Sequence, residues 1–249
     1  ASTGYGHITP GYDRVVRDGV RGLLREIECS LNRHTSGEEQ EFLQAAQISC
    51  RAVITLSSRY SAYLTELAQG LRDPAQRSEV QKLAGICVRV PAEPSASFHE
   101  ALQSLWFIHM CTNIEQICNG LSISRPDQFL YPYYKADLAS GALQEEDAAE
   151  LLDAFVVKMM ENCVSPRDAM AFQQITIGGQ KQDGSDAVNP LSFQILESIA
   201  RIRCAQPLLA VRWHPGISHA FMMECCECLC LGFGLPSIYS DLQYMKVLE

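Results

Sequence analysis

The sequence lacks several features that identify whole classes of protein. No apolar run among the 249 residues approaches the roughly 18 residues of a membrane-spanning helix. The 20 Lys and Arg residues are scattered and form no basic stripe, and the net charge is −9. These features argue against nucleic acid or an anionic membrane surface as the partner. The opening residues, "ASTGYGHITPGY", lack the charged and apolar regions of a signal peptide.

The first residue is Ala1 and not Met, as expected of a processed or truncated product. Apolar residues make up 47% of the chain and charged residues 20%, a composition typical of soluble globular proteins. The cysteine count of 11 is high and odd, which favours reduced thiols and a cytoplasmic location.

Four of these cysteines lie in "ECCECLC", at Cys225, Cys226, Cys228 and Cys230. On a helix, Cys225 and Cys228 share one face, so a metal site, a catalytic thiol and a buried helix all remain open. A closed zinc site needs four N or S ligands, and no second C-x-x-C pair is present. Because free cysteine behaves as a small apolar residue, burial in a core is the favoured interpretation, and no metal is predicted.

The first half of the chain has helical periodicity. Helices are predicted over 11–33, 36–71, 73–91, 98–120 and 143–163. Three of them begin at capping residues: Ser36 with Glu39 three positions later, Asp73 followed by Pro74, and Ser97.

The second half of the chain alternates strands and helices. Strands are predicted over 173–180, 207–213 and 235–241, and helices over 189–203 and from Ser218 to about Leu231. This order indicates parallel βαβ units and an α/β fold. Residues 165–174 and 180–190 are predicted to be exposed loops. No linker separates domains, so we treat residues 1–249 as part of one domain.

Several segments, in one continuous order, resemble the glycyl radical enzymes of the pyruvate formate-lyase superfamily. They include "GYGHITPGY", "VPAEPSASFHEALQSLWF", "DQFLYPYY", "ITIGGQ" and "PLLAVRWHPG". The branch with glycerol and diol dehydratases and choline lyases is most similar. The resemblance implies a ten-stranded α/β barrel wrapped in helices, of which this chain is an incomplete, helix-rich part.

The resemblance also implies a radical mechanism in a longer parent protein. A separate radical-SAM activating enzyme installs a backbone radical on a glycine near the C-terminus, and that radical oxidises a loop cysteine to a thiyl. The thiyl abstracts hydrogen from a small substrate, and a Glu two residues later acts as acid or base. Neither position has a counterpart here, because the "CCE" of Cys225 to Glu227 falls too early and on a predicted helix. No catalytic residue and no bound cofactor are therefore expected within this chain.

Four residues are predicted to contact substrate. The resemblance places His7 and Ser122 at the cavity, where they would bind substrate hydroxyls and take part in proton transfer. A loop histidine or a turn serine is the alternative for each. Arg212 and His214 follow a predicted strand, where α/β proteins often bind ligands.

Two positions depart from the family pattern. Leu121 stands where glycerol dehydratases have His before the serine, which argues against glycerol as substrate. The segment "SISRPDQ" is about two residues short, and the missing residues include a glycine. Losing a glycine from a tight turn should strain the backbone or shift the loop.

Three functional hypotheses follow. The chain is part of an anaerobic lyase or dehydratase, related to formate C-acetyltransferase, that breaks a C–O, C–N or C–C bond and is inactive alone. Alternatively it is a non-catalytic partner or relic subunit that completes a split barrel, or that pairs with the parent protein as a mixed dimer. A metal-binding module built on Cys225 to Cys230 is the third hypothesis.

Overall fold

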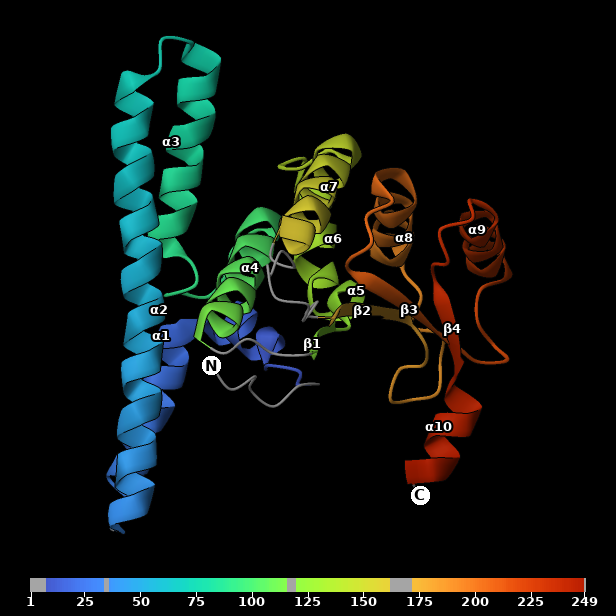
Figure 1. Cartoon of the computed structure of the whole chain (residues 1–249), viewed down its shortest axis with the longest axis horizontal. Helices are drawn as coiled ribbons and strands as arrows, with labels where there is room; N and C mark the ends of the chain where they lie inside the picture. The colour runs from blue at the N-terminus through green and yellow to red at the C-terminus, as the bar shows by residue number, and fades with distance from the viewer. Residues whose placement is uncertain (1–7, 34–35, 116–119, 162–171, 249) are drawn as a thin grey trace. The chain divides into compact units, whose positions relative to one another are not determined.

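The computed structural model describes residues 8–33, 36–115, 120–161 and 172–248. Their contacts divide the chain into two compact units, where the sequence shows no linker. One unit comprises residues 11–112, and the other joins residues 1–10 to residues 113–249. Figure 1 shows the elements of both units along the chain.

The unit of residues 11–112 is helical. It contains α1 (Tyr12–Leu31), α2 (Gly37–Gly70), α3 (Pro74–Arg89) and most of α4 (Phe98–Glu115). The three capping residues predicted from the sequence are confirmed. Ser36 accepts from the Glu39 amide, Asp73 accepts from the Ala75 amide, and Ser97 accepts from the Glu100 amide.

Helix α1 is interrupted at Gly19, which the helical periodicity did not predict. Gly19 has a φ of 67°, and a Cβ there would lie 2.5 Å from the backbone carbon of Glu93. The neighbouring Val20 amide instead donates to the Pro91 carbonyl at 2.8 Å. The local hydrophobic pattern carries no signal of this break, because its cause is a segment some 70 residues further along the chain.

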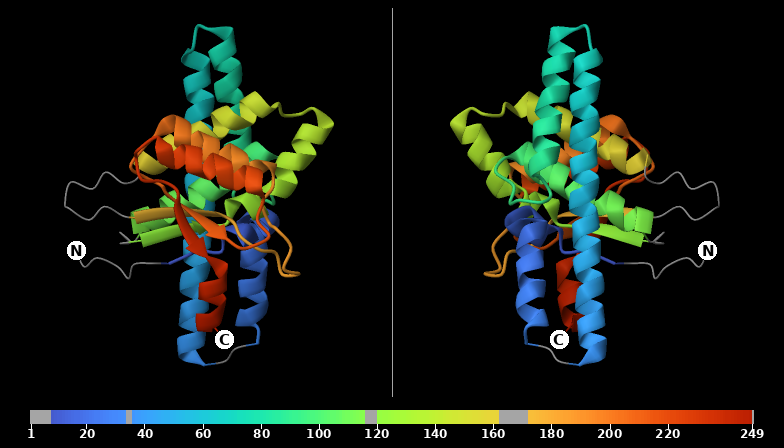
Figure 2. Two further views of the ribbon diagram at one scale, coloured as in Figure 1. Left: turned by 90° about the vertical axis from the view of Figure 1, so that its right-hand side faces the viewer. Right: turned by 90° about the vertical axis from the view of Figure 1, so that its left-hand side faces the viewer.

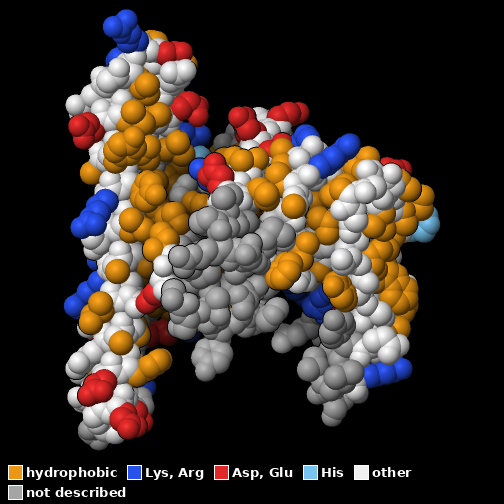
Figure 3. Space-filling model, viewed as in Figure 1, with side chains coloured by type: hydrophobic (Ala, Val, Ile, Leu, Met, Phe, Trp, Pro, Cys, Tyr) orange, Lys and Arg blue, Asp and Glu red, His pale blue; other side chains and the backbone are white. Residues whose placement is uncertain are grey.

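The antiparallel pair of α2 and α3 exposes large apolar side chains. Phe42 is 72% exposed, Ile48 68% and Tyr63 61%. Hydrophobic side chains gather along this pair in Figure 3. Such a surface is more apolar than a water-facing helix usually presents, and contiguous apolar patches commonly mark contact sites.

The other unit is built around a four-stranded parallel sheet in the order β1-β2-β3-β4. The strands are β1 (Gly120–Ser124), β2 (Phe172–Gly178), β3 (Leu208–Trp213) and β4 (Ser237–Ser240). The helices are α5 (Pro126–Phe129), α6 (Tyr131–Ser140), α7 (Glu145–Glu161), α8 (Pro190–Ile202), α9 (His219–Cys230) and α10 (Asp241–Leu248).

The predicted alternation of strands and helices from β2 to β4 is confirmed, and so is the α/β class. Two boundaries were wrong. The helix predicted over 98–120 is described to Glu115, residues 116–119 lie outside the described residues, and Gly120 belongs to β1 and not to the helix. Gln173 and Gln174 belong to β2 and not to an exposed loop, while residues 165–171 lie outside the described residues.

The two faces of the sheet have different environments. Helices α7, α8 and α9 lie along one face in both Figure 1 and Figure 2. The side chains buried on that face are Leu121, Ile175, Ile177, Leu209 and Val211, each at most 1% exposed. Because successive strand residues point to opposite faces, the intervening residues point the other way. Over the described residues, no helix has the length and hydropathy of a bilayer span.

Candidate active site at the carboxyl edge of the sheet

Four parallel strands bring their carboxyl ends to one edge of the sheet. Arg125 follows β1, Gly179 follows β2, His214 follows β3 and Asp241 follows β4. Ligands of open α/β sheets bind outside this edge. It is therefore the candidate site. Arg212 and His214 lie at this edge, and Ser122 lies on β1, one of the strands that end there.

Ser122 lies on β1, beside the segment that follows His7. The Ile8 amide donates to the Gly120 carbonyl at 3.1 Å, and the Ser122 amide donates to the Ile8 carbonyl at 2.9 Å. His7 itself lies outside the described residues. The pairing nonetheless connects the chain immediately after His7 to the strand that carries Ser122, as expected if both positions serve one cavity.

The end of β1 is irregular within the "SISRPDQ" segment. Ser124 has a φ of 66°, and the pairing register with β2 shifts between Ser122 and Ser124. A non-glycine residue in this left-handed region is uncommon and strained. The Ser124 amide donates to the Ser122 hydroxyl at 3.1 Å, and the link between this backbone conformation and a missing glycine stays a prediction.

The glycine pair after β2 makes room for Arg212. Gly178 and Gly179 have φ values of 73° and 79°, a conformation that favours glycine. A Cβ on Gly179 would lie 3.0 Å from both Cβ and Nε of Arg212. The turn is therefore a strand end, as the sequence suggested, and it also allows close approach of a cationic side chain.

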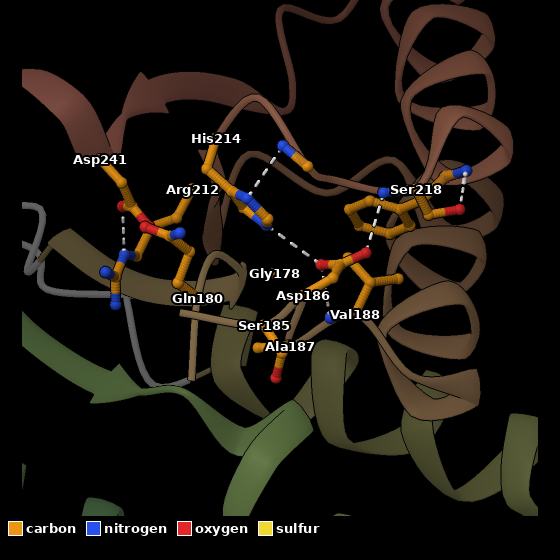
Figure 4. A network of polar contacts seen from close by, with 12 residues as sticks. Gly178, Gln180, Ser185, Asp186, Ala187, Val188, Arg212, His214, Ser218 and Asp241 are labelled. Carbon is orange, nitrogen blue, oxygen red and sulfur yellow. Dashed lines mark hydrogen bonds and ion pairs between the residues drawn. The ribbon is translucent and has the colours of Figure 1, made fainter. Parts of the chain in front are cut away.

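Arg212 is held by a buried carboxylate. Its Nε donates to Asp241 Oδ1 at 2.6 Å, and Asp241 is 1% exposed (Figure 4). The Nη groups of Arg212 have no protein partner among the described residues. Because the guanidinium is fixed through Nε, those Nη donors are oriented at the carboxyl edge and can bind an acceptor.

Arg125 is a second guanidinium at this edge. It donates to the carbonyls of Gly178 and of Gln180, the latter at 3.2 Å. Burial lowers the pKa of Arg125, and the nearby charge of Arg212 lowers it further. An arginine stays protonated under these conditions, so the edge carries two neighbouring positive charges.

His214 is buried, and both of its ring nitrogens are engaged. Nδ1 accepts from the Gly216 amide at 3.2 Å, so Nε2 carries the proton and donates to Asp186 Oδ1 at 3.2 Å. Asp186 also accepts from the Ser218 amide at 2.8 Å (Figure 4). This geometry fits a residue that positions the loop, and direct contact of His214 with substrate stays a prediction.

The loop of residues 180–190 is only partly exposed, which corrects the prediction. Residues 181–185 are exposed, whereas Ala187 is 1% exposed. Gln128 donates to the Ala187 carbonyl at 2.9 Å, and the Val188 amide donates to Asp186 at 3.1 Å. Hydrogen bonds from Gln128 to Ala187 and from His214 to Asp186 therefore hold the second half of this loop, and the Val188 bond is internal to it.

Asp127 is a buried carboxylate that sequence reasoning missed. Its Oδ2 accepts from the Gly178 amide at 2.9 Å and from the Ser192 hydroxyl at 2.8 Å. Burial raises the pKa of Asp127, although these two hydrogen bonds oppose the shift. The available signal was its position directly after a strand and a proline, in the same segment as Arg125.

The cysteine cluster belongs to α9 and not to the candidate site. Cys225 and Cys228 are buried, whereas Cys226 and Cys230 are exposed, so the core interpretation is wrong for the second pair, which the helix turns toward solvent. Burial raises the pKa of Cys225 to about 12, so its thiol stays protonated. Among the described residues, no group of three or more His, Cys, Asp or Glu side chains could hold a metal ion. The core interpretation of Cys225 and Cys228 is confirmed.

Comparison with known proteins identifies the family. The sequence model described as pyruvate formate lyase-like matches residues 1–249. The chain belongs to this family, the glycyl radical enzymes. It is 32% identical to the probable dehydratase YbiW of Escherichia coli, over 96% of this chain and 32% of that protein. It is 33% identical to the isethionate sulfite-lyase of Nitratidesulfovibrio vulgaris, over 92% of this chain and 30% of that protein.

The fold agrees with solved structures of the same family. The glycerol-bound B12-independent glycerol dehydratase from Clostridium butyricum superposes with a TM-score of 0.93 at 32% identity. The superposition covers 99% of this chain and 33% of that chain. The chain thus spans about a third of the length of its relatives, and the resemblance in the sequence is confirmed.

Proposed function

We propose that this chain forms one wall of the substrate cavity of a glycyl radical lyase or dehydratase. The enzyme breaks a C–O, C–N or C–C bond in a small metabolite. The observation that carries the proposal is that, in a chain of this family, the segment after His7 pairs with β1, the strand that bears Ser122. Radical chemistry is supplied by the thiyl and glycyl positions of the family, which have no counterpart in this sequence.

The residues of this chain bind and orient the substrate. His7 and Ser122 offer hydrogen bonds to substrate hydroxyls and support proton transfer when water departs. Arg212 offers its Nη donors to an acceptor at the carboxyl edge. His214 holds the loop of residues 180–190 in place through Asp186. Fixed donors of this kind lower the barrier because they need no reorganisation during the reaction.

The substrate is a small hydroxylated compound other than glycerol. The relatives named above act on isethionate and on glycerol, two small molecules that carry hydroxyl groups. Leu121 is 1% exposed and points to the helix-covered face, opposite Ser122. Glycerol is therefore disfavoured by the departure from the family's His and not by a contact of Leu121 with the cavity.

The wider biology is part of the same proposal. A radical-SAM activating enzyme installs the glycyl radical on the longer protein, which contains no other bound cofactor. The enzyme works in the cytoplasm without oxygen, and a homodimer is the expected assembly.

A chimera tests this function. This chain replaces the matching third of the Clostridium butyricum glycerol dehydratase, and the product is activated without oxygen by a radical-SAM activating enzyme. Electron paramagnetic resonance measures the glycyl doublet, and turnover is assayed with isethionate, 1,2-propanediol and glycerol. We expect the doublet together with turnover of a substrate other than glycerol. A doublet without turnover of any of the three would contradict the proposal.

Ser122→Ala is the matched variant of this chimera. It removes one hydroxyl from the proposed cavity and leaves β1 paired through its backbone. We expect the doublet to persist and kcat/KM to fall by about tenfold, the effect of one lost hydrogen bond to a buried polar group.

A further inference from the structure

The two faces of the sheet differ in polarity along the central part of β2. The helix-covered face carries Leu121, Ile175 and Val211, all buried. The opposite face takes its residues from the alternate positions of the strands. The pairing register places Ser122 beside Gln174, and Gln174 beside Leu208. Two residues further along β2, Thr176 pairs with Ala210.

This polarity is unusual for a parallel sheet. Parallel sheets are generally covered on both faces, so their strands are nearly continuous apolar runs. Strand β2 instead reads Gln174-Ile175-Thr176-Ile177, with strict alternation. Its two isoleucines are at most 1% exposed, whereas Gln174 and Thr176 are half-buried. One face of β2 is therefore suited to an apolar layer and the other is not.

Gln174 and Thr176 also have unused hydrogen-bonding capacity. Among the described residues, neither side chain has a hydrogen-bond partner, although the Gln174 backbone carbonyl accepts from the Ser122 hydroxyl at 3.4 Å. Covering these groups with an apolar layer would cost free energy, because an unpaired buried amide or hydroxyl loses its bonds to water. The face is consistent with a polar cavity that holds water or a hydroxylated ligand.

We infer that Gln174 and Thr176 determine substrate specificity by binding a hydroxyl group of the substrate. This inference rests on the proposed function and adds two residues to the wall that contains Ser122. The Gln174 amide both donates and accepts, and the Thr176 hydroxyl does the same. Neither carries charge, so the two residues recognise a neutral alcohol group. A charged substituent would be bound elsewhere, at the carboxyl edge with its two arginines.

The chimera described above tests the inference. Gln174→Leu and Thr176→Val remove the polar atoms and keep the side-chain volume. Ile175→Val and Ile177→Val are the matched controls, since they alter the same strand on its covered face. Steady-state kcat/KM is measured without oxygen for each hydroxylated substrate, and the glycyl doublet reports an intact fold.

We expect Gln174→Leu and Thr176→Val to lower kcat/KM by roughly tenfold to a hundredfold with the doublet unchanged, mainly through KM. The two controls should stay within twofold. Gln174→Glu adds a negative charge and should reduce turnover of isethionate more than that of 1,2-propanediol. If Gln174→Leu loses the doublet, its fold is not intact and its kcat/KM is not interpreted. The kcat/KM values of Gln174→Glu and Thr176→Val then test the inference.

Two failures can be told apart. If the unaltered chimera turns over substrate and both polar variants keep kcat/KM within twofold, the inference is wrong and the proposed function stands. If the unaltered chimera shows the doublet and no turnover of any tested compound, the proposed function is wrong and the inference falls with it.

Discussion

Substitution of Gly179 by alanine should destabilise the chain in two separable ways. The left-handed φ of 79° costs an alanine roughly 1–2 kcal/mol. The new Cβ would also lie 3.0 Å from Arg212 Nε, so the guanidinium must shift by a few tenths of an ångström, which weakens its hydrogen bond to Asp241. Weakening the bond to that buried carboxylate costs a further ~1–3 kcal/mol. We expect a total loss of about 2–5 kcal/mol in the free energy of unfolding.

Gly184→Ala is the matched control for this experiment. Gly184 has a φ of 81°, and a Cβ there would meet no atom within 4 Å. It therefore has the backbone cost without the displacement of Arg212. Urea unfolding followed by tryptophan fluorescence gives both values, because Trp213 directly follows Arg212 in the sequence. Adding Asp241→Asn to each variant tests whether the additional loss of unfolding free energy in Gly179→Ala comes from the Arg212–Asp241 ion pair.

The expected difference between the two alanine variants is ~1–3 kcal/mol, and it should shrink when Asp241 is replaced. Equal losses for Gly179→Ala and Gly184→Ala would refute the reasoning. They would mean that Arg212 adjusts freely and that the glycine pair does not position it.

Four further outcomes are expected. The raised pKa of Asp127 means that the free energy of unfolding of the wild type falls as pH rises above the usual carboxyl pKa. Asp127→Asn removes this ionisation, so its stability relative to the wild type should be greatest near pH 7.5 and least near pH 4. Urea unfolding at both pH values measures the difference. Ser124→Gly should raise the free energy of unfolding by ~0.5–1 kcal/mol, since it relieves a left-handed φ of 66° at a smaller entropic cost; an unchanged or lower value would show that Ser124 is not strained. A maleimide should label Cys226 in the native protein and leave Cys225 unmodified until urea is added, as mass spectrometry can show. The 249-residue chain alone should be oligomeric in light scattering, because α2 and α3 expose large apolar side chains; a monodisperse monomer would contradict this.

Local signals in the sequence predicted local structure well. The caps at Ser36 and Asp73 fixed two helix starts, because a capping side chain bonds to amides two or three residues away. The break at Gly19 and the start of β1 at Gly120 were missed. Both depend on partners distant in the sequence, namely the segment near Glu93 and the strand that pairs with β1.

The sequence predicted the location of the candidate site but not the carboxylates that hold its residues in place. Residues at strand ends, such as Arg212, could be found because parallel strands share a carboxyl edge. The carboxylates Asp127, Asp186 and Asp241 could not, since an acid in a loop is usually solvated and only the fold shows that each one binds a group at a neighbouring strand end. The polar face of β2 was visible as alternation, but its pairing with Ser122 required the register.

The most direct test of the account is turnover by the chimera that carries this chain in the glycerol dehydratase. The account predicts a glycyl doublet and turnover of a small hydroxylated substrate other than glycerol. It also predicts that Gln174→Leu lowers kcat/KM by about tenfold or more, the effect of losing one hydrogen bond to the substrate. A chimera that carries the doublet and converts none of the hydroxylated compounds would contradict the claim that this chain forms the wall of a substrate cavity.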